Sequence, residues 1–253
     1  MHAPTGHWSD LAADLLERLR ENTPRVHCIT NNVAQNFTAN VLLAAGAIPS
    51  MTISAEEVGA FARRADALLV NLGTFDAERR AAVDIAVAEF NRAQEPWVLD
   101  PVLIDRSPPR ADYARELASR SPAAIRLNSS EFEALDGRDS LEQYAEHHGS
   151  VLALTGAVDM ITDGPNVIRV RNGHPLMGRV TAMGCAEGAF IGAMLAVEPD
   201  RFAAVVSGVM IFGIAGDIAG EKANGPGTFG VQFLDALSNL DRATIRARAK
   251  ISA

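Results

Sequence analysis

The sequence predicts an α/β fold in which a central, mostly parallel sheet is covered by helices on both faces. Short apolar segments rich in β-branched residues alternate with longer segments whose apolar residues recur at helical spacing. The strand segments are apolar throughout, as expected for strands that are buried on both faces. No internal repeat, low-complexity linker or abrupt change of composition interrupts the alternation, so we expect residues 1–253 to form one domain.

In the first half of the chain, helix caps mark where the predicted helices begin. Ser9 can cap a helix whose leucines fall on one face, and Asn32 is predicted to cap a second helix that Gly46 closes. Ser54 and Glu57 fit a capping box and predict the start of a third. Strands are expected over 26–30, 48–53, 67–72, 97–99 and 123–127, and further helices over 78–93 and 111–120.

The second half begins with short helices near Glu131 and Leu141, and its last third is mostly helical. A buried strand is expected over 151–154, a hairpin over 159–170 with its turn at Gly164-Pro165, and helices over 186–197, 201–219 and 229–240. The stretch 202–218 is the longest apolar run, but glycines and Asp217 interrupt it. We therefore interpret it as a buried helix and not as a membrane span.

The charge balance excludes some classes of partner. Lys and Arg together number 23 and Asp and Glu 31, which gives a net charge of −8. Nucleic acids and anionic membranes need a basic face, so neither is expected as a partner. An anionic ligand such as ATP remains compatible, because glycine loops and helix N-termini bind phosphate without net positive charge. With two cysteines and no signal-like segment at the start, we expect a cytoplasmic protein.

Polar residues recur where the predicted strands end, which is where open α/β sheets bind their ligands. Asn31 follows the first strand, Asp100 follows the segment 97–99, and Thr155 follows the segment 151–154. Asp100 has two interpretations: a carboxylate that holds water bound to Mg²⁺, or a turn residue before Pro101.

Asn128 and Glu131 also have two interpretations. Asn-x-x-Glu is a capping-box pattern, with Asn128 as the cap and Glu131 in the first turn. A carboxylate at a helix N-terminus is also held ionised, which suits the outer ligand shell of a metal ion. The two roles are compatible with each other.

Arg126 lies within an apolar strand segment, where a charged side chain is costly unless it is paired. A nucleotide phosphate and a structural carboxylate are equally good partners for it on this evidence.

The segment 179–190 combines a strand end, Gly184 and the start of a helix of small residues. Gly184 lets a phosphate approach the backbone, and the first N–H groups of the helix point towards such an anion. Cys185 would lie in the first turn, where the helix dipole favours the thiolate. It is therefore interpreted either as a group that accepts a proton or attacks a substrate, or as a buried structural cysteine.

Taken together, these residues resemble the hydroxyethylthiazole kinase family of the ribokinase-like superfamily. The similarity extends from Val26 to about Leu240, and its most specific parts are the asparagine-rich first strand end and the Gly-Cys pair. The matching strings are 26–33 with 36–40, 71–74, 99–102, 125–126 with Asn128 and Glu131, 154–156 with 158–159, 172–174, 184–185 and 225–229.

The resemblance implies a ribokinase-like sheet without the lid of larger sugar kinases. It implies transfer of the γ-phosphoryl group of ATP to the primary alcohol of 4-methyl-5-(2-hydroxyethyl)thiazole with Mg²⁺, in thiamine biosynthesis. It also implies a homotrimer with substrate pockets between subunits. Matching positions imply Cys185 beside the substrate hydroxyl; Arg126, Thr155 and Gly184 at ATP; Met51, Ala182 and Asn31 at the thiazole; and Asp100 and Glu131 at the metal.

Three departures from the family pattern each replace glycine with a side chain. They are Leu127 before the Asn-x-x-Glu motif, Ala182 before the Gly-Cys pair, and the stretch 103–109 after Asp-Pro-Val. The alternatives are therefore a ribokinase-like kinase for another alcohol, such as a pyrimidine or pyridoxal type, a lyase acting on a hydrated nicotinamide nucleotide, and a non-catalytic thiazole- or nucleotide-binding relative. An acyl transferase using Cys185 with His174 is a weaker alternative.

Overall fold

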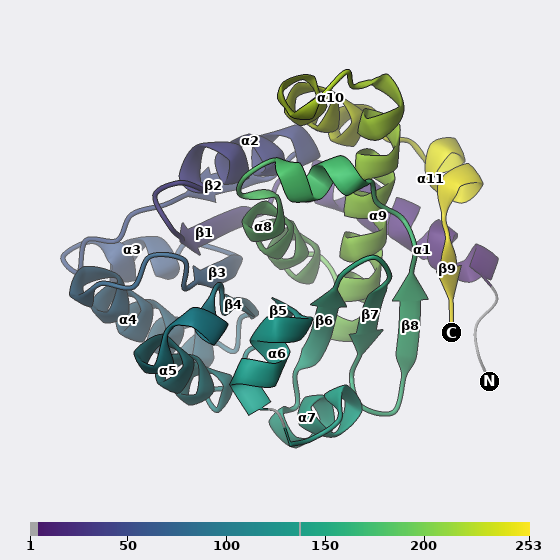
Figure 1. Ribbon diagram of the computed structural model, residues 1–253. Coiled ribbons are helices and arrows are strands. Elements are labelled where there is room, and N and C mark those ends of the chain that lie inside the picture. The colour runs from purple at the N-terminus through teal and green to yellow at the C-terminus, as the bar shows by residue number, and fades with distance from the viewer. Residues whose placement is uncertain (1–4, 137) are drawn as a thin grey trace.

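The computed structural model describes residues 5–136 and 138–253. Residues 1–4 and 137, which belong to the predicted single domain, lie outside the described residues. All described strands join one nine-stranded sheet in the order β2-β1-β3-β4-β5-β6-β7-β8-β9, so none forms a separate lid (Figure 1). The strands are β1 (Arg25–Ile29), β2 (Ile48–Ser50), β3 (Ala67–Asn71), β4 (Trp97–Asp100), β5 (Ala124–Asn128), β6 (Val151–Thr155), β7 (Asp159–Thr162), β8 (Val167–Val170) and β9 (Ile251–Ser252).

The sheet is parallel from β2 to β6 and antiparallel from β6 to β9. The predicted mostly parallel α/β fold is therefore confirmed. The predicted hairpin is also confirmed, because β7 pairs with β8 across a turn that contains Gly164, whose φ is +105°. An L side chain rarely adopts that φ, so glycine suits this turn.

Helices cover both faces of the sheet and bury two separate cores (Figure 1). Side chains from α1, α2, α8, α9 and α10 form one core, and those from α3, α4, α5 and α7 contribute to the other. Successive residues of β3 illustrate the alternation, because Leu69 belongs to the first core while Leu68 and Val70 belong to the second. The helices are α1 (Thr5–Asn22), α2 (Gln35–Ala45), α3 (Val58–Ala62), α4 (Ala77–Ala93), α5 (Pro108–Ala118), α6 (Ser129–Asp136), α7 (Leu141–His148), α8 (Met183–Leu195), α9 (Arg201–Lys222), α10 (Pro226–Asn239) and α11 (Arg242–Arg248).

Three predicted helix caps are wrong. Ser9 lies within α1 and does not begin it. The N-cap residue of α2 is Ala34, and no side chain caps this helix. Oδ1 of Asn31 accepts from the N–H of Ala34 at 2.9 Å, in the turn before the helix. Asn32 instead accepts from the Arg79 guanidinium, a partner far away in sequence. The predicted Ser54–Glu57 capping box is absent, because Glu57 accepts a hydrogen bond from the Thr52 hydroxyl.

Several boundaries also differ from the prediction. β2 ends at Ser50 and not at 53, because it is an edge strand with a partner on one side only. α5 starts at Pro108, since proline is well suited to the first turn of a helix. The sequence analysis missed α11 and β9, and β9 adds the last strand to the sheet beside β8.

Helix α9 is long and apolar enough, by length and composition, to cross a membrane. However, 83% of its most apolar window is buried inside the structure. The interpretation of this stretch as a buried helix is confirmed.

Candidate active site

The carboxyl ends of the parallel strands bring the predicted polar residues to one edge of the sheet. Asn71 and Asp100 end β3 and β4 as register partners, and Asn128 and Thr155 end β5 and β6 in the same way. Asn31 lies just beyond β1. These side chains therefore reach one edge of the sheet, although the first and the last, Asn31 and Thr155, are more than a hundred residues apart in sequence.

Helix α8 begins at this edge because glycines let it lie close to the sheet. A Cβ on Gly188 would approach Leu69 at 3.1 Å and the Asp100 side chain at 3.7 Å. At Gly184 the fit is tighter, since a Cβ there would lie 2.5 Å from Nη2 of Arg126. The start of α8 is thus held directly against the Arg126 guanidinium.

A chain of hydrogen bonds connects Cys185 with Asp100. Nδ2 of Asn31 donates to Sγ of Cys185 at 3.4 Å and to Oδ1 of Asn71 at 3.0 Å. Nδ2 of Asn71 then donates to Oδ2 of Asp100 at 2.5 Å. Asn31 and Asn71 therefore fix the thiol and the carboxylate relative to each other.

Asp100 is fully buried and only partly satisfied. Its Oδ1 has no hydrogen-bond partner within the described chain, and it lies 3.7 Å from Nη1 of Arg126. Burial raises the pKa of Asp100 to about 7, a rise that the Arg126 charge opposes and the Glu131 charge supports. An oxygen in this position can accept from a water or approach a cation when a ligand fills the site.

Glu131 is held at the start of α6 by a complete capping box. Asn128 accepts from the N–H of Glu131, and Glu131 accepts from the N–H of Asn128, both at 2.9 Å. The other carboxylate oxygen of Glu131 accepts from the N–H of Leu103 at 3.0 Å. The predicted cap is confirmed, and it fixes the orientation of a buried carboxylate beside the Asp100 loop.

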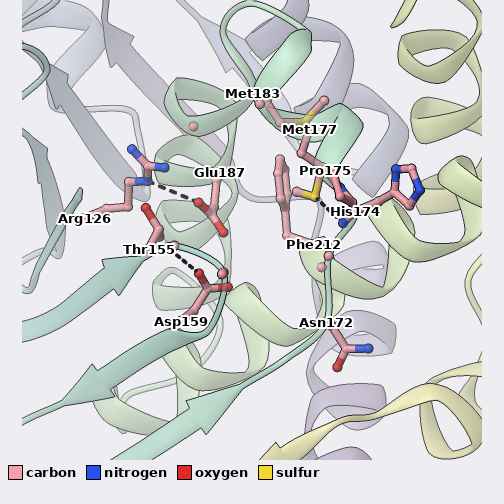
Figure 2. A pocket seen from close by; sticks show the side chains of 16 residues that line it. Arg126, Thr155, Asp159, Asn172, His174, Pro175, Met177, Met183, Glu187 and Phe212 are labelled. Carbon is pink, nitrogen blue, oxygen red and sulfur yellow. Dashed lines mark hydrogen bonds and ion pairs between the residues drawn. The ribbon is translucent and has the colours of Figure 1, made fainter. Parts of the chain in front are cut away.

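A cavity of about 660 Å³ opens beside these strand ends (Figure 2). Arg126, Thr155 and Gly184, the three predicted ATP residues, all line it. Figure 2 shows Arg126 on one side of the cavity and the apolar side chains of Phe212 and Met177 on the other. The cavity thus has a charged end and an apolar end, as expected for a ligand with a phosphate and a base.

Two acidic residues that sequence reasoning did not select lie between those ends. Glu187 of α8 accepts from Nε of Arg126 at 3.1 Å, and Asp159 accepts from the N–H of Gly156 at 2.8 Å. Burial raises the pKa of Asp159 to about 7, and the Glu187 charge raises it further. Burial alone would lower the pKa of Arg126, but the charges of Glu187 and Asp100 raise it above its ordinary value. Arg126 therefore stays cationic, and its structural partner is a carboxylate.

The start of α8 presents backbone N–H groups to the site. Its N-cap residue, Ala182, has a left-handed conformation with φ of 69°, and no side chain caps the helix. The first N–H groups of a helix have no carbonyl partner within it, so they are free to bind an anion. This geometry agrees with the phosphate site predicted at Gly184.

Burial favours the second interpretation of Cys185, a buried structural cysteine. Burial raises the pKa of this thiol to about 11, and the neighbouring Asp100 charge adds to the rise. Hydrogen bonds from Asn71 and Asn31 and the Arg126 charge lower the pKa of Cys185, but they do not offset the effect of burial. Cys185 is therefore a neutral thiol at physiological pH.

Met51 lies apart from the cavity. It is half-buried beside the first core and follows Ser50, whose hydroxyl bonds Nδ1 of His27 at 2.8 Å. Nε2 of His27 bonds the carbonyl of Thr52 at 3.0 Å, so this histidine fixes the backbone on both sides of Met51. Met51 is not among the residues that line the cavity, and neither are Asn31, Ala182 and Cys185.

One signal in the sequence could have found Glu187. It is an acid within the apolar helix Met183–Leu195, and a buried charge needs a partner of opposite sign. The same argument drew attention to Arg126 in its apolar strand. Asn71 was visible as a strand-end residue, but its two amide contacts depend on neighbouring strands.

Comparisons with known proteins agree with this geometry. Residues 16–243 match the model of the hydroxyethylthiazole kinase family. The hydroxyethylthiazole kinase of Granulibacter bethesdensis is 45% identical over 253 residues, covering 93% of this chain and 92% of that protein. The structure of a hydroxyethylthiazole kinase protein from Pyrococcus horikoshii has a TM-score of 0.91 and 37% identity, and covers 95% of this chain and 98% of that chain.

A more distant solved structure supports the fold alone. A ribokinase-like superfamily protein from Enterococcus faecalis has a TM-score of 0.67 and 16% identity, and covers 91% of this chain and 95% of that chain. The architecture is thus ribokinase-like, as predicted, and the high identity over nearly the whole length identifies the narrower group. The chain belongs to the hydroxyethylthiazole kinase family.

Proposed function

We propose that this protein transfers the γ-phosphoryl group of ATP to the primary alcohol of 4-methyl-5-(2-hydroxyethyl)thiazole, in thiamine biosynthesis or salvage. The observation that carries the proposal is the position of the α8 N-terminus. Its free N–H groups and Arg126 lie at the charged end of the cavity. Cys185 directly follows Gly184, which lines that end. A phosphoryl group bound there would lie between a nucleotide in the cavity and an alcohol beside the thiol.

The chain's own residues supply positioning and charge, which phosphoryl transfer needs more than covalent chemistry. Arg126 and the backbone at Gly184 bind the phosphates, and Thr155 lines the cavity beside them. The apolar wall of Phe212 and Met177 receives the base. N–H groups at the start of α8 stabilise charge on the transferring group without any reorganisation, because the helix already aims them.

Mg²⁺ fits the residues at the strand ends. No group of three His, Cys, Asp or Glu side chains in the described part of the chain forms a metal cage. Magnesium keeps several waters and is usually held by one or two carboxylates together with substrate phosphates. Asp100, with its unpartnered Oδ1, and Glu131 are the two carboxylates we assign to it. Bound there, the ion would neutralise charge on the phosphates.

Cys185 positions the alcohol and does not act as its base. A thiol with a pKa of about 11 is a poor proton acceptor at neutral pH. A dissociative transition state also needs little help from a base, because the alcohol loses its proton late. Asn31 keeps the thiol in place, and Ala182 and Met51 line the thiazole site in this assignment.

The thiazole site is completed in a cytoplasmic homotrimer. Four large apolar side chains on or beside α2, β2 and α3 are exposed, namely Val33, Leu43, Ile48 and Phe61. Exposed apolar groups of this kind mark protein interfaces. Both cysteines are free thiols, which fits a reducing compartment.

The proposal is tested by incubating purified protein with Mg-ATP and the thiazole alcohol and measuring the phosphorylated alcohol by mass spectrometry. We expect product and ADP in equal amounts, and no ADP when the alcohol is omitted. Thiazole binding without product would instead indicate a non-catalytic relative. If other alcohols are phosphorylated and this one is not, the enzyme is a kinase of different specificity.

A further inference from the structure

Glu187 is a buried acid whose position the proposed chemistry does not explain. It lies one helical turn after Gly184 in α8, and 8% of its side chain is exposed. Oε2 accepts from Nε of Arg126 at 3.1 Å, although the two residues are 61 positions apart. Because both side chains are buried and oppositely charged, each removes the penalty of burying the other.

Arg126 has a second carboxylate within reach. Asp100 Oδ1 lies 3.7 Å from Nη1, further than a hydrogen bond. The backbone at Gly184 packs against one face of the guanidinium and restricts its movement in that direction, since a Cβ on Gly184 would lie 2.5 Å from Nη2. Of its five N–H donors, the Nε–H is the one that has a hydrogen-bond partner in the described structure. The Nη donors at the cavity end remain for a ligand.

We propose that Glu187 is a positioning residue that holds Arg126 by Nε, so that its Nη groups bind nucleotide phosphates and do not fold onto Asp100. This inference rests on the proposed nucleotide site. Arginine has several rotatable bonds, and its free side chain would pair with the nearest unsatisfied carboxylate. Without Glu187 that carboxylate is Asp100, and a bidentate pair with it would use the donors that the phosphates need.

The test compares a ligand that has phosphates with one that lacks them. Binding of ADP and of adenosine is measured by calorimetry for the wild-type protein and for Glu187→Gln. We expect Glu187→Gln to weaken ADP binding by about tenfold or more, because charge-assisted contacts with Arg126 are lost, and to leave adenosine binding within about twofold. Equal losses for both ligands would mean that Glu187 supports the whole cavity or contacts the nucleoside, and would overturn the inference.

A matched control and a double-mutant cycle sharpen the test. Glu198→Gln removes a carboxylate from another Arg–Glu pair of the same 3.1 Å separation, with Arg18, away from the cavity. It should leave binding of both ligands unchanged. In an Arg126→Ala background, Glu187→Gln should cause no further loss of ADP affinity, since it acts through Arg126. A full additional loss contradicts the proposal.

The remaining outcomes are also distinguishable. If Glu187→Gln does not fold, Glu187→Asp decides in its place, since the shorter carboxylate keeps the charge but misplaces the guanidinium. It should lose ADP affinity selectively, and an unchanged ADP affinity would refute the inference. If the wild-type protein binds neither ligand, the proposed nucleotide site itself is wrong, and this inference falls with it.

Discussion

The candidate active site has two ends, and they differ in whether their residues line the cavity of a single chain. The proposed nucleotide end, assigned to Arg126, Thr155, Gly184 and Glu187, lines a cavity of about 660 Å³. The proposed alcohol end, assigned to Asn31, Met51, Ala182 and Cys185, lies outside that cavity.

The difference has a physical reason. The proposed nucleotide end depends on charged groups, and a buried charge is costly unless it is paired. Arg126 has Glu187 and Asp100 for this purpose. The proposed alcohol end consists of amides, a thiol and apolar groups, which carry no charge and need no ionic partner. The paired charges of the proposed nucleotide end thus lie within one chain, and the alcohol end is where we propose that another subunit contributes.

Asp100 lies between the two ends, and its removal should have the largest effect. It contacts Asn71 towards the alcohol end and Arg126 towards the nucleotide end. We expect Asp100→Ala to lower kcat by about 10³-fold or more, as for loss of a main electrostatic group. Cys185→Ala, which removes a neutral thiol, should lower kcat only about tenfold. Steady-state kinetics on both variants would overturn this order if the losses were equal or reversed.

His27 should make stability depend on pH at the alcohol end. Burial lowers its pKa from 6.5 to about 4, so between these values the unfolded chain takes up a proton that the folded chain refuses. The contribution of His27 to the free energy of unfolding is therefore fully present above about pH 6.5. It falls by about 3 kcal/mol in total as the pH decreases towards 4. Urea unfolding at several pH values gives the free energy of unfolding as a function of pH. This free energy should depend less steeply on pH in His27→Gln than in the wild-type protein. Parallel curves for the two proteins would contradict the assignment.

Gly184→Ala should affect the nucleotide end alone. The added Cβ would lie 2.5 Å from Nη2 of Arg126, so the guanidinium must move. We expect the KM for ATP to rise about tenfold, the effect of losing one good phosphate contact, while the KM for the thiazole changes little. Gly192→Ala is the control on the same helix, because its Cβ would meet its nearest neighbour, Val26, at an ordinary 3.7 Å. A shared rise in both KM values would show that the two ends are not separable.

Ala182→Gly should have the smallest effect and should act at the alcohol end. Ala182 has φ of 69°, a left-handed conformation that costs about 1 kcal/mol for a residue with a Cβ. The added freedom of glycine in the unfolded chain offsets much of the gain, so stability should change by less than about 1 kcal/mol. The KM for the thiazole should change by a few fold, and that for ATP should not.

Leu103→Gly is the comparison for Ala182→Gly. Leu103 has a similar φ of 57° and is half exposed, but its position is not assigned to the thiazole. Thermal unfolding should show a comparable small shift without any change in the KM for the thiazole. If Leu103→Gly changed that KM as much as Ala182→Gly does, the assignment of Ala182 to the alcohol end would be wrong.

The sequence alone determined the order of the elements and the features that depend on near neighbours. Apolar periodicity predicted the strands and most helices, and the Asn128–Glu131 capping box and the hairpin turn at Gly164 were correct, because each depends on a few adjacent residues. Polar residues at strand ends predicted which side chains would converge. The single-domain organisation and the roles of the site residues stay predictions.

Only the tertiary structure decided which groups pair and which are charged. The Arg126–Glu187 pair, the Asn31–Asn71–Asp100 chain and the contact between Asn32 and Arg79 all depend on which neighbours the fold supplies. The start of a helix favours the thiolate of Cys185, but burial favours the neutral thiol. Helix and strand preferences act between neighbours along the chain, whereas burial and charge act between atoms that only the fold brings together.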